Sequence, residues 1–196
     1  MKRFRSASSI LLVMALVLPL LATACGKSVG NTIDDATITS ILDDARFAPS
    51  GGNRQPWRVA VVKDPMLRRE LATLMQPVWD EYLETAMVGG TPFNVVDYVK
   101  PTDISPNKAN ALLTNIETIP VVLAVAVDLS NVAMMDSGLD RLPVTGGASI
   151  YPFCWNLMLS ARAHGLGGVM TTFLSRVEPA AALGRPSPRR GAHLAR

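Results

Sequence analysis

Along the chain, apolar residues alternate between helical spacing and continuous strand-like runs. Helical spacing holds between acidic caps at 34–35 and Pro49, which ends the first predicted helix. A second helix begins at Asp64 and Pro65, an N-cap and first-turn pair, and carries Pro77 in its interior, where a kink is expected. The first half of the chain therefore predicts two amphipathic helices.

Three apolar runs, which alternate with the predicted helices along the chain, predict strands. They lie at 59–62, 121–127 and 168–174. Further helices are predicted to start at Ser105, after a Gly- and Pro-rich loop, and to cover 150–161 before a stop at Gly165. Strands interleaved with long helices predict an α+β or α/β sandwich in one layered domain, without an internal repeat or an interdomain linker.

The first 25 residues have the layout of a targeting segment rather than that of a folded domain. A basic start at 2–5 precedes an uncharged run at 10–24, which is shorter than the roughly 20 residues of a membrane-spanning helix. The run ends in LATACG, which resembles a bacterial lipoprotein signal with Cys25 as the lipid-modified residue, although Ala22 replaces the usual Leu, Val or Ile. An unprocessed anchor or a misassigned gene start are the alternatives. We expect a membrane-anchored lipoprotein outside the cytoplasm, or a cytoplasmic protein if the segment is unprocessed.

The formal net charge of +3 is concentrated at the two ends of the chain. Between Gly26 and Ser175 there are 11 basic and 15 acidic residues, so the body of the protein is mildly acidic. A basic surface that could attract nucleic acid is not indicated. We therefore expect no nucleic-acid partner.

The segment PSGGNRQPW, residues 49–57, has the composition of a ligand loop. Ser50 and Asn53 offer hydrogen-bond donors and acceptors, and the glycines at 51–52 let backbone N–H groups approach a planar ligand. Pro49 and Pro56 stiffen the two ends of the loop. We interpret it as a binding loop.

Other candidate motifs fail on spacing or order. CGKS at 25–28 lacks the first glycine of a phosphate-binding P-loop, and GLGG at 165–168 follows a helix where a dinucleotide site would need a strand. Cys154 lies on the apolar face of its predicted helix, which favours a packed thiol over a reactive one. His164 at the helix C-terminus is interpreted as structural rather than catalytic, and no residues have metal-ligand spacing.

Two long segments resemble the nitroreductase family. APSGGNRQPWRVAVVKDP, residues 48–65, is similar to that family's FMN-binding signature, and GGASIYPFCWNLMLSARAHGLGGVMTT, residues 146–172, to its central helix and following strand. The resemblance implies a nitroreductase-like α+β fold: a three-layer sandwich, homodimeric, with a central, mainly antiparallel sheet flanked by helices. It divides the chain into a signal or lipoprotein-like segment (1–25), an FMN-binding domain (26–184) and a disordered basic tail (185–196).

The resemblance also implies an activity. It suggests an FMN-dependent oxidoreductase that takes hydride from NADH or NADPH through flavin N5 to nitroaromatic, quinone-like or related acceptors, with no catalytic side chain. The alternative is a truncated, non-catalytic relative that binds flavin poorly or not at all. The family's phosphate-binding R-x-S-x-R element is reduced here to KSVG, with Gly30 at the second arginine, and the C-terminal arm that embraces the partner is shortened. We expect the homodimer to be weakened accordingly.

Positions that match the family motifs are the candidate cofactor-binding residues. Ser50, Gly52 and Asn53 correspond to the family's contacts with the ring edge and ribityl chain, and Gln55 shapes the loop. Gly168, Thr171 and Thr172 fall in the stretch that resembles the family's backbone contact near flavin N5. The resemblance also implies a late basic residue at the phosphate, for which Arg185, Arg189 and Arg190 are the alternatives. The candidate set is Lys27, Ser28, Pro49, Ser50, Gly51, Gly52, Asn53, Gln55, Gly168, Thr171, Thr172 and Arg185.

Overall fold

The computed structural model describes residues 9–17, 32–96, 98, 100–176 and 194–195. It contains a five-stranded sheet in the order β4-β1-β3-β2-β5, in which every neighbouring pair is antiparallel. The strands are β1 (Ser9–Val17), β2 (Trp57–Val62), β3 (Val121–Asp128), β4 (Gly167–Thr171) and β5 (Leu194–Ala195). The α-helices are α1 (Asp35–Ala45), α2 (Pro65–Met87), α3 (Ala111–Asn115) and α4 (Tyr151–Ala163). Within these described residues, no helix is long and apolar enough to cross a membrane.

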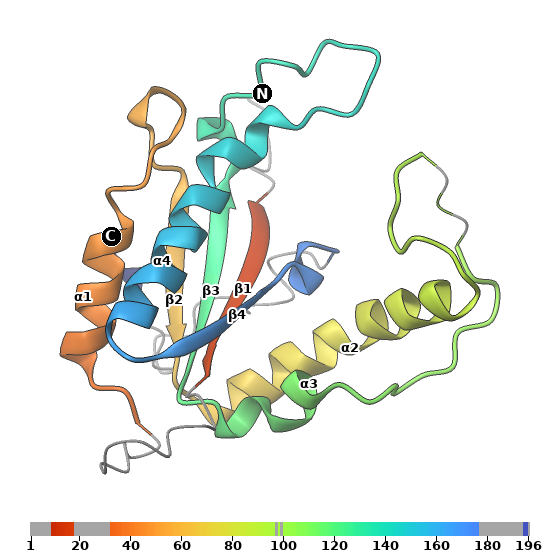
Figure 1. Cartoon of the computed structure of the whole chain (residues 1–196), viewed down its shortest axis with the longest axis horizontal. Helices are drawn as coiled ribbons and strands as arrows, with labels where there is room; N and C mark the ends of the chain where they lie inside the picture. The colour runs from red at the N-terminus through yellow and green to blue at the C-terminus, as the bar shows by residue number, and fades with distance from the viewer. Residues whose placement is uncertain (1–8, 18–31, 97, 99, 177–193, 196) are drawn as a thin grey trace, which may run out of the picture.

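Helices cover both faces of the sheet, which makes three layers. Alternate residues of β3 belong to different cores: Val121, Leu123 and Val125 pack with α1 and α4, whereas Val122 and Ala124 pack with α2 and α3. All five are at most 1% exposed. Figure 1 shows α1 and α4 side by side over the sheet, and α2 with α3 extending away from the other side. The mixed α+β fold and antiparallel sheet are as predicted.

Side-chain caps fix where the helices begin. Asp34 accepts the Thr37 N–H at 2.7 Å ahead of α1, and Asp64 accepts the Met66 N–H at 2.9 Å ahead of α2. Both starts agree with the sequence prediction, and Pro77 lies inside α2 as expected.

The predicted helix start at Ser105 is wrong. The helix α3 begins only at Ala111, behind Asn110, whose side chain accepts the N–H groups of the first turn. Asn107 has a φ of 58°, which a right-handed helix does not allow, and its N–H donates to the buried carboxylate of Asp80 at 2.8 Å. A tertiary contact with α2 thus holds 105–110 out of the helical conformation.

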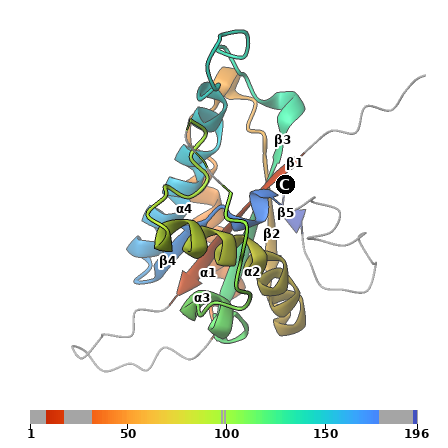
Figure 2. The same ribbon diagram turned by 90° about the vertical axis from the view of Figure 1, so that its right-hand side faces the viewer.

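The last predicted strand is also shorter than expected. Strand β4 ends at Thr171, and the chain turns into the 3-10 helix η5 (Phe173–Arg176). The Thr171 hydroxyl accepts the Phe173 N–H at 3.3 Å, which caps this turn. In the tail that sequence analysis took as disordered, residues 194–195 form β5 at the edge beside β2 (Figure 2).

Residues 9–17, interpreted from sequence as part of a targeting segment, form a strand inside the sheet. Strand β1 lies between β3 and β4, and Val13 is in register with both Ala124 and Thr171. An uncharged apolar run has the composition of a strand buried on both sides as well as that of a signal. Cleavage before Cys25 would remove β1. A chain processed as a lipoprotein could therefore not form this five-stranded sheet.

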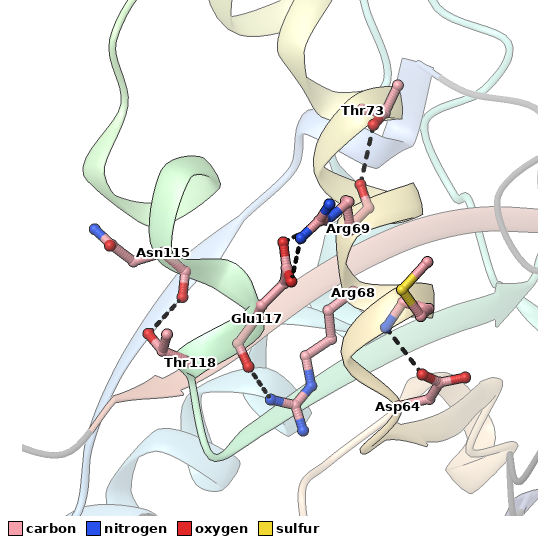
Figure 3. Close-up of polar contacts among 8 residues, drawn as sticks. Asp64, Arg68, Arg69, Thr73, Asn115, Glu117 and Thr118 are labelled. Carbon is pink, nitrogen blue, oxygen red and sulfur yellow. Dashed lines mark hydrogen bonds and ion pairs between the residues drawn. The ribbon is translucent and has the colours of Figure 1, made fainter.

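A buried arginine joins α2 to the ends of β2 and β3. Arg68 is 5% exposed, and all five of its N–H groups donate to backbone carbonyls. The acceptors are Val62, Lys63, Glu117, Ile119 and Pro120. Figure 3 shows the guanidinium directed at the Glu117 backbone, while the neighbouring Arg69 reaches the Glu117 carboxylate. Desolvation lowers the pKa of Arg68 from its usual value.

Replacing Arg68 with Lys should destabilise the protein markedly. Lysine supplies three donors for five carbonyls, so at least two buried acceptors lose their partners, at a cost of about 2–4 kcal/mol in the free energy of unfolding. Urea denaturation of the full chain measures this cost. Arg69→Lys is the matched control, because its ion pair with Glu117 is exposed to solvent and contributes little to stability. Equal losses in the two variants would contradict the assignment.

A proline in β1 tests whether the N-terminal segment belongs to the fold. Val13→Pro removes a backbone donor from a strand that pairs on both sides, so we expect a loss of about 2 kcal/mol or more in the purified full-length chain. Thr23→Pro, in the same segment but outside β1, is the control. Mass spectrometry establishes that residue 1 or 2 is still the N-terminus. Wild-type stability of Val13→Pro would show that β1 is dispensable.

Candidate functional site

The loop that joins α1 to β2 has a strained backbone. Within it, the short 3-10 helix η1 (Gly51–Asn53) contains Gly52 at φ 60°, and Asn53 and Gln55 have φ values of 52° and 47°. Asparagine tolerates this left-handed region, whereas glutamine rarely adopts it. Such positions cost on the order of 1–3 kcal/mol each and persist only where the surroundings enforce them, which happens most often at functional sites.

Hydrogen bonds inside the protein enforce this loop conformation. The Ser50 hydroxyl accepts the Gln55 N–H at 3.0 Å, and the Gln55 amide donates to the Arg46 carbonyl at 3.1 Å. The Asn53 N–H donates to the Ser50 carbonyl, and the Gly51 N–H to the Ser149 hydroxyl at 3.0 Å. The N–H groups of Gly51, Asn53 and Gln55 thus have partners within the protein. Asn53 is exposed, as are its neighbours Arg54 and Gln55.

The base of the loop is fixed to the central helix α4. Trp57, the first residue of β2, stacks on Phe153 with ring centroids 4.5 Å apart and an angle of 13° between the rings. Both side chains are buried. Cys154 follows in the same core, where burial raises the pKa of its thiol to about 12. This supports its interpretation as a packed thiol.

A cavity of about 520 Å³ lies at the end of β3 and contains one of the predicted residues, Thr172. Its volume is within the range of small-molecule and cofactor sites. The described residues that line it are all uncharged and mostly apolar: Val127, Leu129, Val132, Met134, Pro143, Val144, Gly146, Gly147, Ile150, Tyr151, Thr172 and Ser175. Such a lining suits a flat, uncharged ring better than an ionic group.

Two glycines that sequence analysis did not single out allow close approach in this cavity. Gly146 and Gly147 belong to the 3-10 helix η4 (Thr145–Ser149). A Cβ on Gly147 would lie 2.9 Å from the ring of Tyr151, so a larger residue would displace that ring. Ser149, which holds Gly51 of the signature loop, lies in the same short helix. Thus η4 connects the loop to the cavity.

The loop between the 3-10 helix η3 (Leu129–Asn131) and η4 is closed by a buried carboxylate, Asp136. It accepts the Thr145 hydroxyl at 2.5 Å, the Val144 N–H at 2.8 Å and Arg141 at 2.9 Å. The pKa of Asp136 is therefore well below its usual range, through the Thr145 hydroxyl first and the Val144 N–H next. No sequence motif marks this residue, because its partners lie five to nine positions away in an irregular loop.

The remaining predicted residues are distributed around the cavity rather than gathered in it. Thr171 is buried and caps η5, Gly168 is exposed on β4, and Gln55 lines a separate cavity of about 390 Å³ with Trp57. Among the described residues, the signature loop and Thr172 thus border different hollows. Lys27, Ser28 and Arg185 lie outside the described residues.

The family comparison agrees with this α+β sandwich and its signature loop. The nitroreductase family model matches residues 30–191, so the chain belongs to the nitroreductase family. This confirms the resemblance stated above and makes the protein a nitroreductase-family flavin oxidoreductase. A similar protein is 5,6-dimethylbenzimidazole synthase of Rhodospirillum rubrum, 28% identical over 155 residues, which are 79% of this chain and 67% of the relative.

The buried thiol gives a direct test of the α4 core. Cys25→Ser leaves Cys154 as the single cysteine. With a pKa of about 12, this thiol should not react with a disulfide reagent such as DTNB at pH 8 in the folded protein, and should react with one equivalent after denaturation in guanidinium. Rapid stoichiometric labelling of the folded protein would contradict the burial of Cys154.

Proposed function

We propose that the protein is an FMN-dependent NAD(P)H oxidoreductase that reduces nitroaromatic, quinone-like or related electron-poor acceptors. The observation that carries this proposal is the uncharged cavity that holds Thr172 and is connected through η4 to the signature loop. Family membership supplies the flavin chemistry. NADH or NADPH is the proposed cosubstrate.

The cavity suits the ring system of a flavin and not its phosphate. Its lining is uncharged, and the missing side chains of Gly146 and Gly147 let Met134 and the Tyr151 ring pack close to the backbone as parts of that lining. A phosphate needs positive charge, for which the sequence offers Lys27 and Arg185 outside the described residues. We therefore assign the ring to the cavity and the phosphate to those basic residues.

The protein's contribution in this proposal is to bind and orient. A bound flavin supplies the capacity to carry two electrons between a nicotinamide and an acceptor. In this proposal Thr172 contacts the ligand inside the cavity, and Asn53 reaches it from the strained loop outside the cavity. No side chain is required as a general acid or base.

We propose that a homodimer completes the site through the outer face of α4. Tyr151, Trp155 and Leu159 follow each other at intervals of four residues, and each is more than half exposed. A helix presents such positions as one stripe. Because Tyr151 also lines the cavity, a second subunit on this stripe would lie beside the ligand.

Spectroscopy of the purified full-length chain tests the activity. We expect visible flavin absorbance after addition of FMN, bleaching by NADH or NADPH without oxygen, and recovery with a quinone or a nitroaromatic compound. Assays of the same samples should include formation of 5,6-dimethylbenzimidazole, the product named by the relative. Failure to bind FMN at micromolar concentration would favour the alternative of a non-catalytic relative.

Substitutions of Asn53 separate ligand contact from backbone strain. Asn53→Gly keeps the positive φ without strain but removes the amide, whereas Asn53→Ala removes the amide and adds strain. If the amide holds the flavin, both variants should bind FMN about 1–3 kcal/mol more weakly, and only Asn53→Ala should also lower the melting temperature. Fluorescence titration and thermal unfolding measure the two effects. Wild-type affinity in Asn53→Gly would exclude Asn53 from the site.

A further inference from the structure

The buried carboxylate of Asp136 joins two parts of the loop that are distant in sequence. One oxygen accepts Val144 N–H and Arg141, and the other accepts the hydroxyl and the N–H of Thr145, the latter at 3.3 Å. Four donors saturate most of the carboxylate's acceptor capacity. The side chain thereby closes the chain between residues 136 and 145 into a ring.

The two stems of this ring form one wall of the Thr172 cavity. Met134 belongs to the stem before Asp136, and Pro143 and Val144 to the stem after it. The tip between the stems is solvent-exposed: Leu139 is 58% exposed and Leu142 51%. Ala133 and Met134 of the first stem lie close to Gly51 and Gly146, and among the described side chains it is Asp136 that hydrogen-bonds the two stems to each other.

We propose that Asp136 is a positioning residue for the flavin ring, because it holds Met134, Pro143 and Val144 as a preformed apolar wall of the cavity. This inference rests on the proposed function. The ligand that it serves is a flat, uncharged ring, since the wall offers apolar surface and no charged group. Asp136 acts through the wall and need not touch the ligand.

The expected effect follows from preorganisation. If the wall is in place in only a tenth of the molecules, the apparent dissociation constant rises about tenfold. Asp136→Asn should have this effect, because its amide nitrogen cannot accept the donors that the carboxylate accepts. Riboflavin should lose affinity by the same factor as FMN, since the phosphate is assigned outside this cavity.

The experiment compares wild-type full-length protein with Asp136→Asn, Thr145→Val and Asp140→Asn. Thr145→Val removes a single hydroxyl donor and serves if Asp136→Asn fails to fold. Asp140→Asn makes the same chemical change at an exposed position of the same loop. Fluorescence titration with FMN and riboflavin gives the dissociation constants, thermal unfolding reports folding, and visible circular dichroism at saturation reports the orientation of the bound ring.

The proposal predicts about tenfold weaker binding and an altered dichroism spectrum for Asp136→Asn, a smaller change of the same kind for Thr145→Val, and wild-type behaviour for Asp140→Asn. Flavin binding by the wild type with unchanged affinity and spectrum in folded Asp136→Asn would overturn this inference and leave the proposed function intact. If Asp136→Asn does not fold, unchanged affinity and spectrum in Thr145→Val overturn it. Absence of flavin binding by the wild type would overturn both.

Discussion

Strand β3 must be covered on both faces and along both edges, and this requirement organises the whole molecule. Its residues from Val121 to Val125 are buried without interruption, which a strand with one face in water does not permit. The helices α1 and α4 cover one face, and α2 and α3 cover the other. Along the edges, β2 and β1 take up its backbone hydrogen bonds, and a sheet lacking either strand would expose unpaired donors and acceptors.

The candidate site is located where this buried strand ends. The N–H of Asp128, the last residue of β3, donates to the Pro56 carbonyl at 2.8 Å, which places the end of the strand beside the end of the signature loop. The Asp128 carboxylate then accepts the N–H and hydroxyl of Ser130, which turns the chain into η3 and the loop beyond it. Both loops of the site therefore leave the sheet from one point.

The sequence predicts the parts of this structure whose causes are local. Helix caps at Asp34 and Asp64 and the apolar run of β3 require only neighbouring residues, and the structure has them where they were expected. Ser105 also has the local signal of a helix start, but the carboxylate of Asp80, 25 residues earlier, binds the backbone nearby and prevents a helix. An apolar run such as 9–17 is compatible with both a signal and a central strand, so its pattern could not decide between them.

The same distinction applies to the candidate site. The signature loop could be recognised from its residue types, since glycine, asparagine and proline restrict the backbone locally. Apart from Thr172, the cavity lining could not be recognised, because residues such as Met134 and Gly147 meet Thr172 only through the fold, and the Gly51–Ser149 contact spans 98 positions. Motif matching therefore finds polar groups of the candidate site and misses its apolar walls.

The two sides of the cavity differ in how firmly the fold holds them. Tyr151 and Ile150 begin α4, whose core position is fixed by the Trp57–Phe153 stack, whereas the opposite wall depends on one carboxylate in an irregular loop. A ligand against α4 meets a surface that cannot shift without disturbing the core. A wall held by Asp136 can be displaced at the cost of a few hydrogen bonds. In the proposed enzyme, the flavin ring would therefore lie between a wall that the core fixes and a wall that Asp136 fixes, so a change at Asp136 could alter ligand binding without disturbing the core.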